Sequence, residues 1–114
     1  MQLKSSQYNG AQVLKVDDDR IDASVAVQFK ATAQELTSST SGRVILDLSN
    51  VTFVDSSGLG AIVGSMKQLG RERRLDLVGL NPAVDKVFKM TRMDSVFQIY
   101  ETLDDATQET ANAS

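Results

Sequence analysis

Two residue types are missing from this chain of 114 residues: it has neither cysteine nor histidine. Without cysteine there are no disulfides, no thiolate metal sites and no cysteine nucleophile. Without histidine the chain lacks the commonest general base and the commonest metal ligand. We therefore expect no catalytic residues and no metal site.

An excess of positive charge and a long apolar run are missing as well. Lys and Arg number 12 against 15 Asp and Glu, so nothing favours nucleic acid or an anionic membrane as a partner. The start "MQLKSSQYNG" has no apolar signal core, and no run has the length of a membrane span. We expect a soluble cytoplasmic protein, with one domain over residues 1–114 and a loose polar tail from about residue 110.

Strand and helix patterns alternate along the chain. A hairpin is predicted around Asn9-Gly10, a dipeptide that favours a tight turn. The runs "RVILDL" and "RLDLVGL" are typical of buried strands, and "VFQIY" of a short strand. Helical spacing follows Asp22, a predicted N-cap, and recurs after Asp55, after Asn81 and, more weakly, in "TLDDATQET". This order predicts an α/β fold with a mixed, mainly parallel sheet of about five strands and about four helices.

The stretch "NVTFVDSSGLGAIVGSMKQLG", residues 50–70, places two serines between a strand and an amphipathic helix. The simplest interpretation is that Asp55 or Ser56 caps the helix, since both residue types cap well. One cap needs one residue, however, and Asp-Ser-Ser-Gly supplies three candidates. In an α/β fold we expect this tip at the carboxyl end of a strand, where binding sites form.

A nucleophilic serine is the second interpretation, and the residue inventory argues against it. There is no histidine to take the proton, and "DSSGLG" lacks the Gly-x-Ser-x-Gly elbow. A Ser–Lys pair would need Lys67, about three helical turns beyond Ser56. The phosphate-binding pattern Gly-x-x-x-x-Gly-Lys-Ser/Thr is also missing.

Modification of a serine is the third interpretation. A serine on an exposed tip next to glycine is accessible to the active site of another protein. A phosphoryl group added there meets free backbone N–H groups and the positive end of the helix dipole. The tip would therefore accept phosphate without unfolding.

These residues also resemble a known family. The segment "VILDLSNVTFVDSSGLGAIVGSMKQLG" closely resembles the signature of STAS-domain anti-anti-sigma factors, which antagonise bacterial anti-sigma kinases. The segment "RIDASVAVQF" resembles the family's Leu-Asp-x-x-x-Ala segment, and "LDLVGLNPAVDKVFKMTRMDSVFQIYET" resembles its carboxyl-terminal half. The resemblance covers nearly the whole chain and implies the STAS fold.

The resemblance also implies functional residues. Ser56 corresponds to the phosphorylated serine of the family, and Asp22 to the acidic residue beside it. Asp19 stands where the family usually has glycine. The residues expected next to the phosphosite are Asp22, Asp55, Ser57 and Gly58.

A partner switch follows from this resemblance. Unphosphorylated, the protein would bind an anti-sigma factor of the GHKL kinase type and free a sigma factor. The kinase would then phosphorylate Ser56 with its own ATP, and a metal-dependent serine phosphatase would remove the phosphate. The ATP and the metal belong to those partners, so this chain needs no cofactor.

A partner-binding surface is predicted on the helix after Asp55. The small residues of this helix fall on a different side from its apolar face; they are Ser57, Gly60, Ala61 and Gly64. Close packing on the sheet is one explanation of the glycines. Glycine inside a helix costs about 1 kcal/mol relative to alanine, so two of them favour a surface kept flat for a partner.

Other interpretations stay open from the sequence. A STAS domain also serves as an accessory of a lipid or anion transporter or as part of a signalling scaffold, since fold does not settle function. A small serine hydrolase is the most remote alternative. The basic cluster "RERR", residues 71–74, is predicted to be a solvated turn, with contact to an acidic rim on a partner as the alternative. Residues 17–19 are predicted to form a hairpin or a strand-end loop, because no twelve-residue calcium loop follows.

Overall fold

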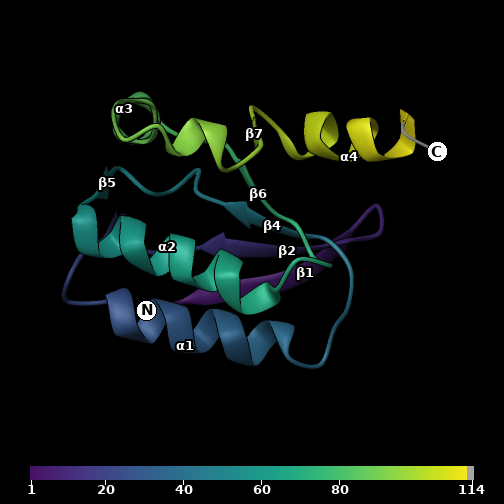
Figure 1. Cartoon of the computed structure of the whole chain (residues 1–114), viewed down its shortest axis with the longest axis horizontal. Helices are drawn as coiled ribbons and strands as arrows, with labels where there is room; N and C mark the ends of the chain where they lie inside the picture. Colours follow the sequence, from purple (N-terminus) through teal and green to yellow (C-terminus); the bar gives the residue numbers. More distant parts are fainter. Residues whose placement is uncertain (113–114) are drawn as a thin grey trace.

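A five-stranded sheet forms the centre of the computed structural model, which describes residues 1–112 (Figure 1). The strand order is β1-β2-β4-β6-β7, with β1 and β2 antiparallel and the other neighbouring pairs parallel. The predicted mixed, mainly parallel sheet is confirmed. The strands are β1 (Leu3–Tyr8), β2 (Ala11–Val16), β4 (Val44–Asp47), β6 (Leu75–Val78) and β7 (Ile99–Tyr100).

Two short strands, β3 (Arg20–Ile21) and β5 (Phe53–Val54), pair in parallel outside this sheet. The sequence did not predict them, because two residues are too few to show an alternating pattern. The strand β5 leads directly into α2 (Ser56–Leu69). The Asp-Ser-Ser-Gly tip therefore lies at the carboxyl end of a strand, as expected, but that strand belongs to the small ribbon and not to the central sheet.

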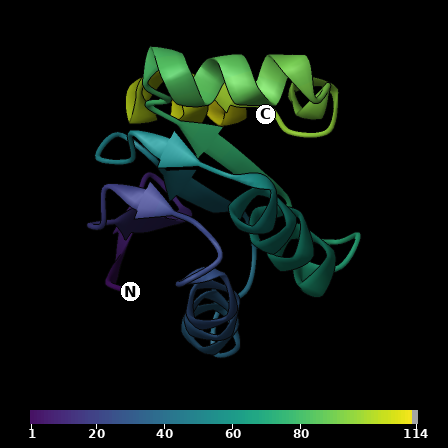
Figure 2. The ribbon, with the colours of Figure 1, turned by 90° about the vertical axis from the view of Figure 1, so that its left-hand side faces the viewer.

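Four helices flank the strands, as predicted. Both views place α1 and α2 on one side of the molecule and α3 and α4 on the opposite side (Figures 1 and 2). Along residues 1–112, none of the helices has the length and apolar character needed to cross a bilayer. Besides α2, the helices are α1 (Ala26–Thr37), α3 (Pro82–Met90) and α4 (Leu103–Asn112), with a 3₁₀ turn η1 (Met93–Ser95).

The helix α4 extends to Asn112, so it occupies most of the segment that the sequence predicted as a loose tail from about residue 110. The rest of that predicted tail, residues 113–114, lies outside the described residues.

Alternate residues of the sheet pack on opposite faces. The register aligns Leu14, Leu46 and Leu77 in one row, and each is at most 2% exposed. The next row places Val13 beside Ile45, which packs with Ala106 of α4 on the other face. Burial of one such aliphatic side chain stabilises the fold by about 1.5–3 kcal/mol. Helices on both faces explain why the central strands are almost continuously apolar.

Polar contacts join α4 to distant parts of the chain. The Asn9 Nδ2 atom, in the turn between β1 and β2, donates to Thr107 Oγ1 at 3.2 Å. Arg43 donates from Nη1 to the carbonyl of Ala106 at 2.7 Å and from Nε to the buried carboxylate of Asp76, also at 2.7 Å. The predicted Asn9-Gly10 turn is confirmed, with positive φ at both residues. The turn therefore also positions the Asn9 side chain to bind α4.

The basic cluster at residues 71–74 is more than the predicted solvated turn. Arg73 donates from Nε to the carbonyl of Gly42 at 2.7 Å and from Nη1 to the carbonyl of Thr37 at 2.9 Å. Arg74 pairs with Asp76 at 3.0 Å. The prediction is wrong for Arg73, which is half-buried because its guanidinium satisfies carbonyl groups at the end of α1.

The first turn of α2 lies against the backbone of β3. Gly58 is buried, and a Cβ atom placed there would be 1.9 Å from the carbonyl oxygen of Ile21. Only glycine fits this contact. Gly60, two residues further along the helix, faces open space, with nothing within 4 Å of such a Cβ.

This difference predicts opposite effects of the same substitution. We expect Gly58→Ala to lower the free energy of unfolding by about 2–3 kcal/mol, because the new methyl group overlaps a backbone carbonyl. Gly60→Ala should raise it by about 0.5–1 kcal/mol through helix propensity. Urea denaturation of both variants measures the two changes. A Gly58→Ala variant as stable as the unmodified protein would contradict the contact.

Candidate functional site

Asp55 caps the helix α2. Its Oδ1 atom accepts a hydrogen bond from the Gly58 amide at 2.8 Å, and its Oδ2 atom accepts one from the Ala23 amide at 3.2 Å. The Asp55 amide in turn donates to the carbonyl of Ile21 at 3.3 Å. Of the two predicted capping residues, Asp55 is the one that acts as the cap. Its carboxylate also ties α2 to the segment after β3.

Ser56 is the first residue of α2, and its hydroxyl has no structural role in the described part of the chain. The side chain is exposed and makes no hydrogen bond there. Ser57 is likewise exposed. The amides of the first helical turn have no partner within the helix, and Asp55 satisfies only the Gly58 amide among them. A group attached to Ser56 therefore lies next to free donors.

Asp22 lies beside this tip but does not cap α1. That helix begins at Ala26 after Val25, with no side-chain cap, so the predicted N-cap is wrong. The Oδ1 atom of Asp22 instead accepts hydrogen bonds from the amide of Ser24 at 3.0 Å and from its hydroxyl at 2.6 Å. Its Oδ2 atom accepts one from Arg20 Nε at 3.3 Å. The Ser24 hydroxyl, and then Arg20, lower the pKa of Asp22 below its usual value.

Sequence reasoning missed Arg20. Its guanidinium lies 4.3 Å from the centroid of the Phe53 ring, in a cation–π contact, and also pairs with Asp22. The register of the ribbon places Arg20 directly opposite Phe53, so both side chains lie on the same face. A cation two residues before the predicted acidic residue was the available signal. Its significance depends on the ribbon, which the sequence did not indicate.

Asp19 has an ordinary backbone conformation where the family usually has glycine. Among residues 1–112, Asn9 and Arg92 are the non-glycine residues with positive φ, so Asp19 requires no glycine-like conformation. Its carbonyl accepts hydrogen bonds from the amide of Thr52 at 2.8 Å and from its hydroxyl at 3.2 Å. The departure from the family pattern therefore causes no backbone strain and adds one negative charge near the ribbon.

The small residues of α2 do not share one exposed face. Ser57 and Gly60 are exposed, whereas Ala61 is only 7% exposed and belongs to the hydrophobic core. Gly64 is partly covered by Lys30 of α1, whose Cε would lie 3.1 Å from a Cβ atom at that position. The prediction of a single exposed surface is wrong for Ala61 and Gly64, because α1 packs beside this part of α2.

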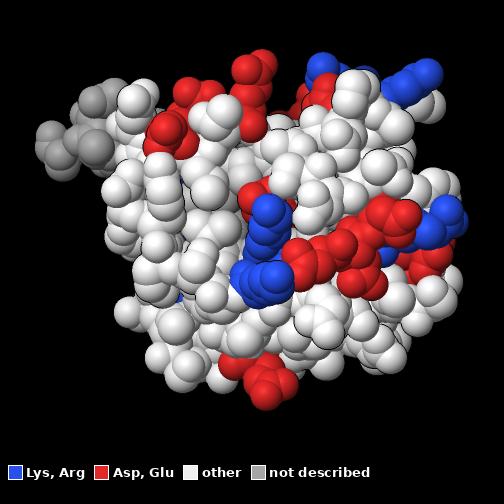
Figure 3. Space-filling view, turned by 180° about the vertical axis from the view of Figure 1, so that it is seen from behind, with Lys and Arg blue, Asp and Glu red and all other residues white. Residues whose placement is uncertain are grey.

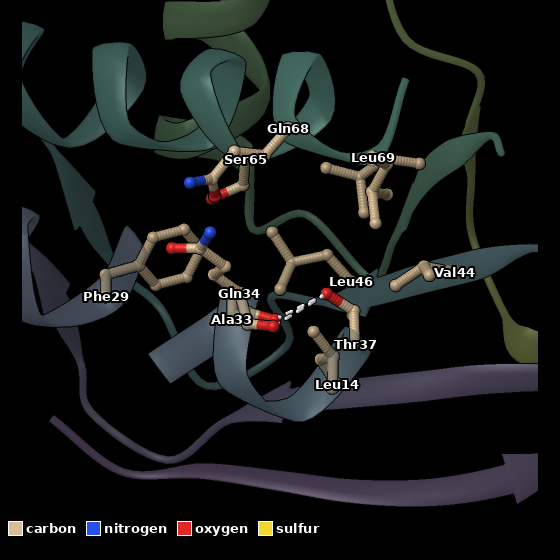
Figure 4. Close-up of a pocket in the computed structure, with 11 residues that line it drawn as sticks. Leu14, Phe29, Ala33, Gln34, Thr37, Val44, Leu46, Ser65, Gln68 and Leu69 are labelled. Atoms are coloured by element: carbon tan, nitrogen blue, oxygen red, sulfur yellow. Dashed lines mark hydrogen bonds between the residues drawn. The ribbon is translucent and has the colours of Figure 1, made fainter. Parts of the chain in front are cut away.

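The interior offers no room for a small organic ligand between α1, α2 and the sheet. The cavity there measures about 10 Å³, close to the volume needed for one water molecule. Figure 4 shows its lining side chains, among them Leu14, Phe29 and Leu46, around a hydrogen bond from the Thr37 hydroxyl to the Ala33 carbonyl.

Charged side chains gather on the face opposite to that of Figure 1. Acidic atoms form a band over the right-hand half of this view, with basic atoms at both of its ends (Figure 3). Within the described residues, no group of three or more carboxylates is arranged to hold a metal ion. Residues 17–19 form a loop after β2, as predicted, and Asp17 pairs there with Lys4 at 3.3 Å.

Comparisons with known proteins agree with the fold. The STAS domain model matches residues 2–106. An anti-sigma-B factor antagonist of Listeria monocytogenes is 34% identical over 93 residues, which cover 73% of this chain and 81% of that protein. The crystal structure of an anti-sigma factor antagonist from Mycobacterium paratuberculosis has a TM-score of 0.84 at 27% identity, covering 95% of this chain and 92% of that one.

The chain belongs to the STAS domain family. The same fold occurs in a murine Slc26a9 anion transporter, with a TM-score of 0.78 at 18% identity, where the match covers 96% of this chain and 19% of the transporter. That likeness shows the fold alone.

The hydrogen bonds of Asp22 can be tested by measuring its pKa. Ser24→Ala removes the main cause of the lowered pKa, so the pKa of Asp22 should rise toward its usual value. A carboxylate with a lowered pKa stabilises the folded state above its unfolded pKa, and this stabilisation is lost as the pH falls through the folded pKa. The stability difference between about pH 7 and about pH 3 should therefore shrink in Ser24→Ala.

Carboxyl ¹³C NMR measures the pKa, and chemical denaturation at the two pH values measures the stability. The exposed Ser57→Ala is the matched control and should leave the titration of Asp22 unchanged. An unaltered Asp22 pKa in Ser24→Ala would refute the assigned cause.

Proposed function

We propose that this protein is an anti-sigma factor antagonist whose binding is switched by phosphorylation of Ser56. The unphosphorylated form binds an anti-sigma factor of the GHKL kinase type in the cytoplasm, and a sigma factor is released. The kinase phosphorylates Ser56 with its own ATP, and a metal-dependent serine phosphatase reverses the step. The protein is thus a regulatory binding partner, and its relatives named as antagonists support this role.

The observation that best supports Ser56 as the phosphorylation site is that its side chain makes no contact that the fold needs. Asp55 does all the capping, so the exposed Ser56 hydroxyl at the start of α2 has no partner to lose on modification. The start of a helix favours an added phosphate through the dipole, by about 0.3–1 kcal/mol. Phosphorylation should therefore leave the fold intact.

The effect of phosphate on binding has a different origin. A dianion buried against a partner that offers it no matching cation costs several kcal/mol. Asp22 and Asp55 already make the tip acidic, so a partner that fits the unmodified tip also meets repulsion between like charges once phosphate is added. Since each 1.4 kcal/mol is a factor of ten in affinity, we expect phosphorylation to weaken the complex by about a hundredfold or more.

We expect the cognate anti-sigma kinase and ATP to place one phosphate on Ser56. Mass spectrometry should locate it there in the unmodified protein and find none in Ser56→Ala. Ser56→Ala should bind the kinase constitutively. Ser56→Asp should bind poorly, though better than the phosphoprotein because it carries about half the charge.

The control for the site of modification is Ser57→Ala, which should still receive one phosphate, on Ser56. Isothermal titration of each form gives the affinities, and amide NMR spectra report the fold. Phosphate mainly on Ser57, or equal affinity of both forms, would exclude the proposed switch.

The partner surface is proposed to include the exposed side of the first turns of α2, at Ser57 and Gly60. Gly60 faces open space, so a large side chain there would obstruct a partner without disturbing the core. Gly64 is the weaker candidate because Lys30 partly covers it. Ala61 is too buried for its side chain to contact a partner.

Gly60→Arg should reduce affinity for the anti-sigma partner at least tenfold while the melting temperature stays near that of the unmodified protein. Gly60→Ala adds only a methyl group at the same position and should retain binding. Titration and thermal melting of the two variants separate an effect on the interface from one on folding. Full binding by Gly60→Arg would place the partner elsewhere.

A further inference from the structure

We propose that Arg20 is the counter-cation of phosphorylated Ser56, an inference that rests on the phosphorylation switch proposed above. In the unmodified protein its guanidinium is held by Phe53 and Asp22. On phosphorylation it would remain on the aromatic ring and share its charge between Asp22 and the phosphoryl group.

The ribbon brings Arg20 to the same side as the tip. Arg20 pairs with Phe53 and Ile21 with Val54, and the bond from the Asp55 amide to the Ile21 carbonyl extends this pairing by one step. Side chains two residues apart along a strand lie on the same face. Arg20 itself lies at the first step of the ribbon, and its guanidinium lies on the face that carries Asp22, the residue that follows the ribbon, with which it pairs.

Most N–H groups of the Arg20 guanidinium make no hydrogen bond within the described residues. Only its Nε atom makes a hydrogen bond within the described residues, at 3.3 Å to Asp22. The two terminal nitrogen atoms make none there, and 56% of the side-chain surface is exposed. A planar guanidinium with two free N–H groups matches phosphate oxygens better than an ammonium group does. The stack on Phe53 restrains the side chain before any phosphate arrives.

The other charges around the tip are negative. Asp22 and Asp55 flank Ser56, and Asp19 begins the same ribbon segment. The next cation along α2 is Lys30 of α1, which contacts the helix at Gly64, two turns beyond the tip. A phosphoserine here thus meets carboxylates that disfavour its dianion, and the helix amides and Arg20 that favour it.

The second ionisation of phosphoserine, near pH 6, provides the measurement. Phosphoserine is inserted at position 56 during translation, so that no kinase is needed, and ³¹P NMR follows its pH titration. Loss of a nearby cation disfavours the dianion, so Arg20→Gln should raise the pKa of the phosphate by about 0.5 pH units at low salt. About 1 M salt should reduce the difference, since the pair is exposed to solvent.

The matched control is Arg71→Gln, which removes the same charge from an exposed site just beyond the far end of α2. It should leave the phosphate pKa unchanged. Equal phosphate pKa values in the Arg20→Gln variant and its parent, or the same shift in Arg71→Gln, would overturn the proposal. If the kinase fails to modify Ser56 but the ³¹P shift is present, the proposed function fails and the assignment of Arg20 stands.

Discussion

The contact between the first turn of α2 and the carbonyl of Ile21 is the constraint on which the rest of the site depends. It requires glycine at position 58, since no side chain fits at 1.9 Å. It also brings the Asp55 carboxylate within hydrogen-bonding distance of Ala23, so that the cap joins two segments that are 32 residues apart. A helix held further from the ribbon would lose this bond.

This arrangement separates the stability of the fold from the state of the serine. The cap, the close glycine contact and the apolar underside of α2, where Ile62 is fully buried, all lie on the inner side of the helix or at Asp55. The exposed hydroxyl takes part in none of them. A protein that alternates between two charge states without refolding needs this independence, because a modification that broke the cap would also weaken the core beneath it.

The sequence predicted what has a periodic pattern and missed what does not. The strand β4 (Val44–Asp47) was predictable because its aliphatic residues suit a strand that is buried on both faces. The hairpin turn was predictable because Asn9 and Gly10 both tolerate the positive φ that they adopt. The two-residue ribbon has no period to detect, and its absence from the prediction hid the role of Arg20. Family resemblance directed attention to Ser56, but the assignment of the cap to Asp55 required atomic distances.

Two further predictions were wrong because they depended on contacts that sequence spacing does not reveal. Asp22 was predicted to cap the helix that follows, yet its oxygens are satisfied by Ser24 and Arg20 before that helix begins. Ala61 was assigned to an open surface, yet tertiary packing buries it. In the first case, side chains two residues away occupy the oxygens that a helix cap would use. In the second case, packing against the core covers a small residue of α2.

The attachment of α4 has a consequence for how the protein is made. Asn9 and Thr107, which are 98 residues apart, and Arg43 and Ala106, which are 63 residues apart, meet only when the last helix is present. During synthesis on the ribosome, the chain emerges from its amino terminus. Val13 and Ile45 therefore leave the exit tunnel long before the helix that covers them. The part of the sheet that α4 covers therefore stays open until residues 103–112 have emerged, and until then these apolar side chains are accessible to aggregation and to chaperones.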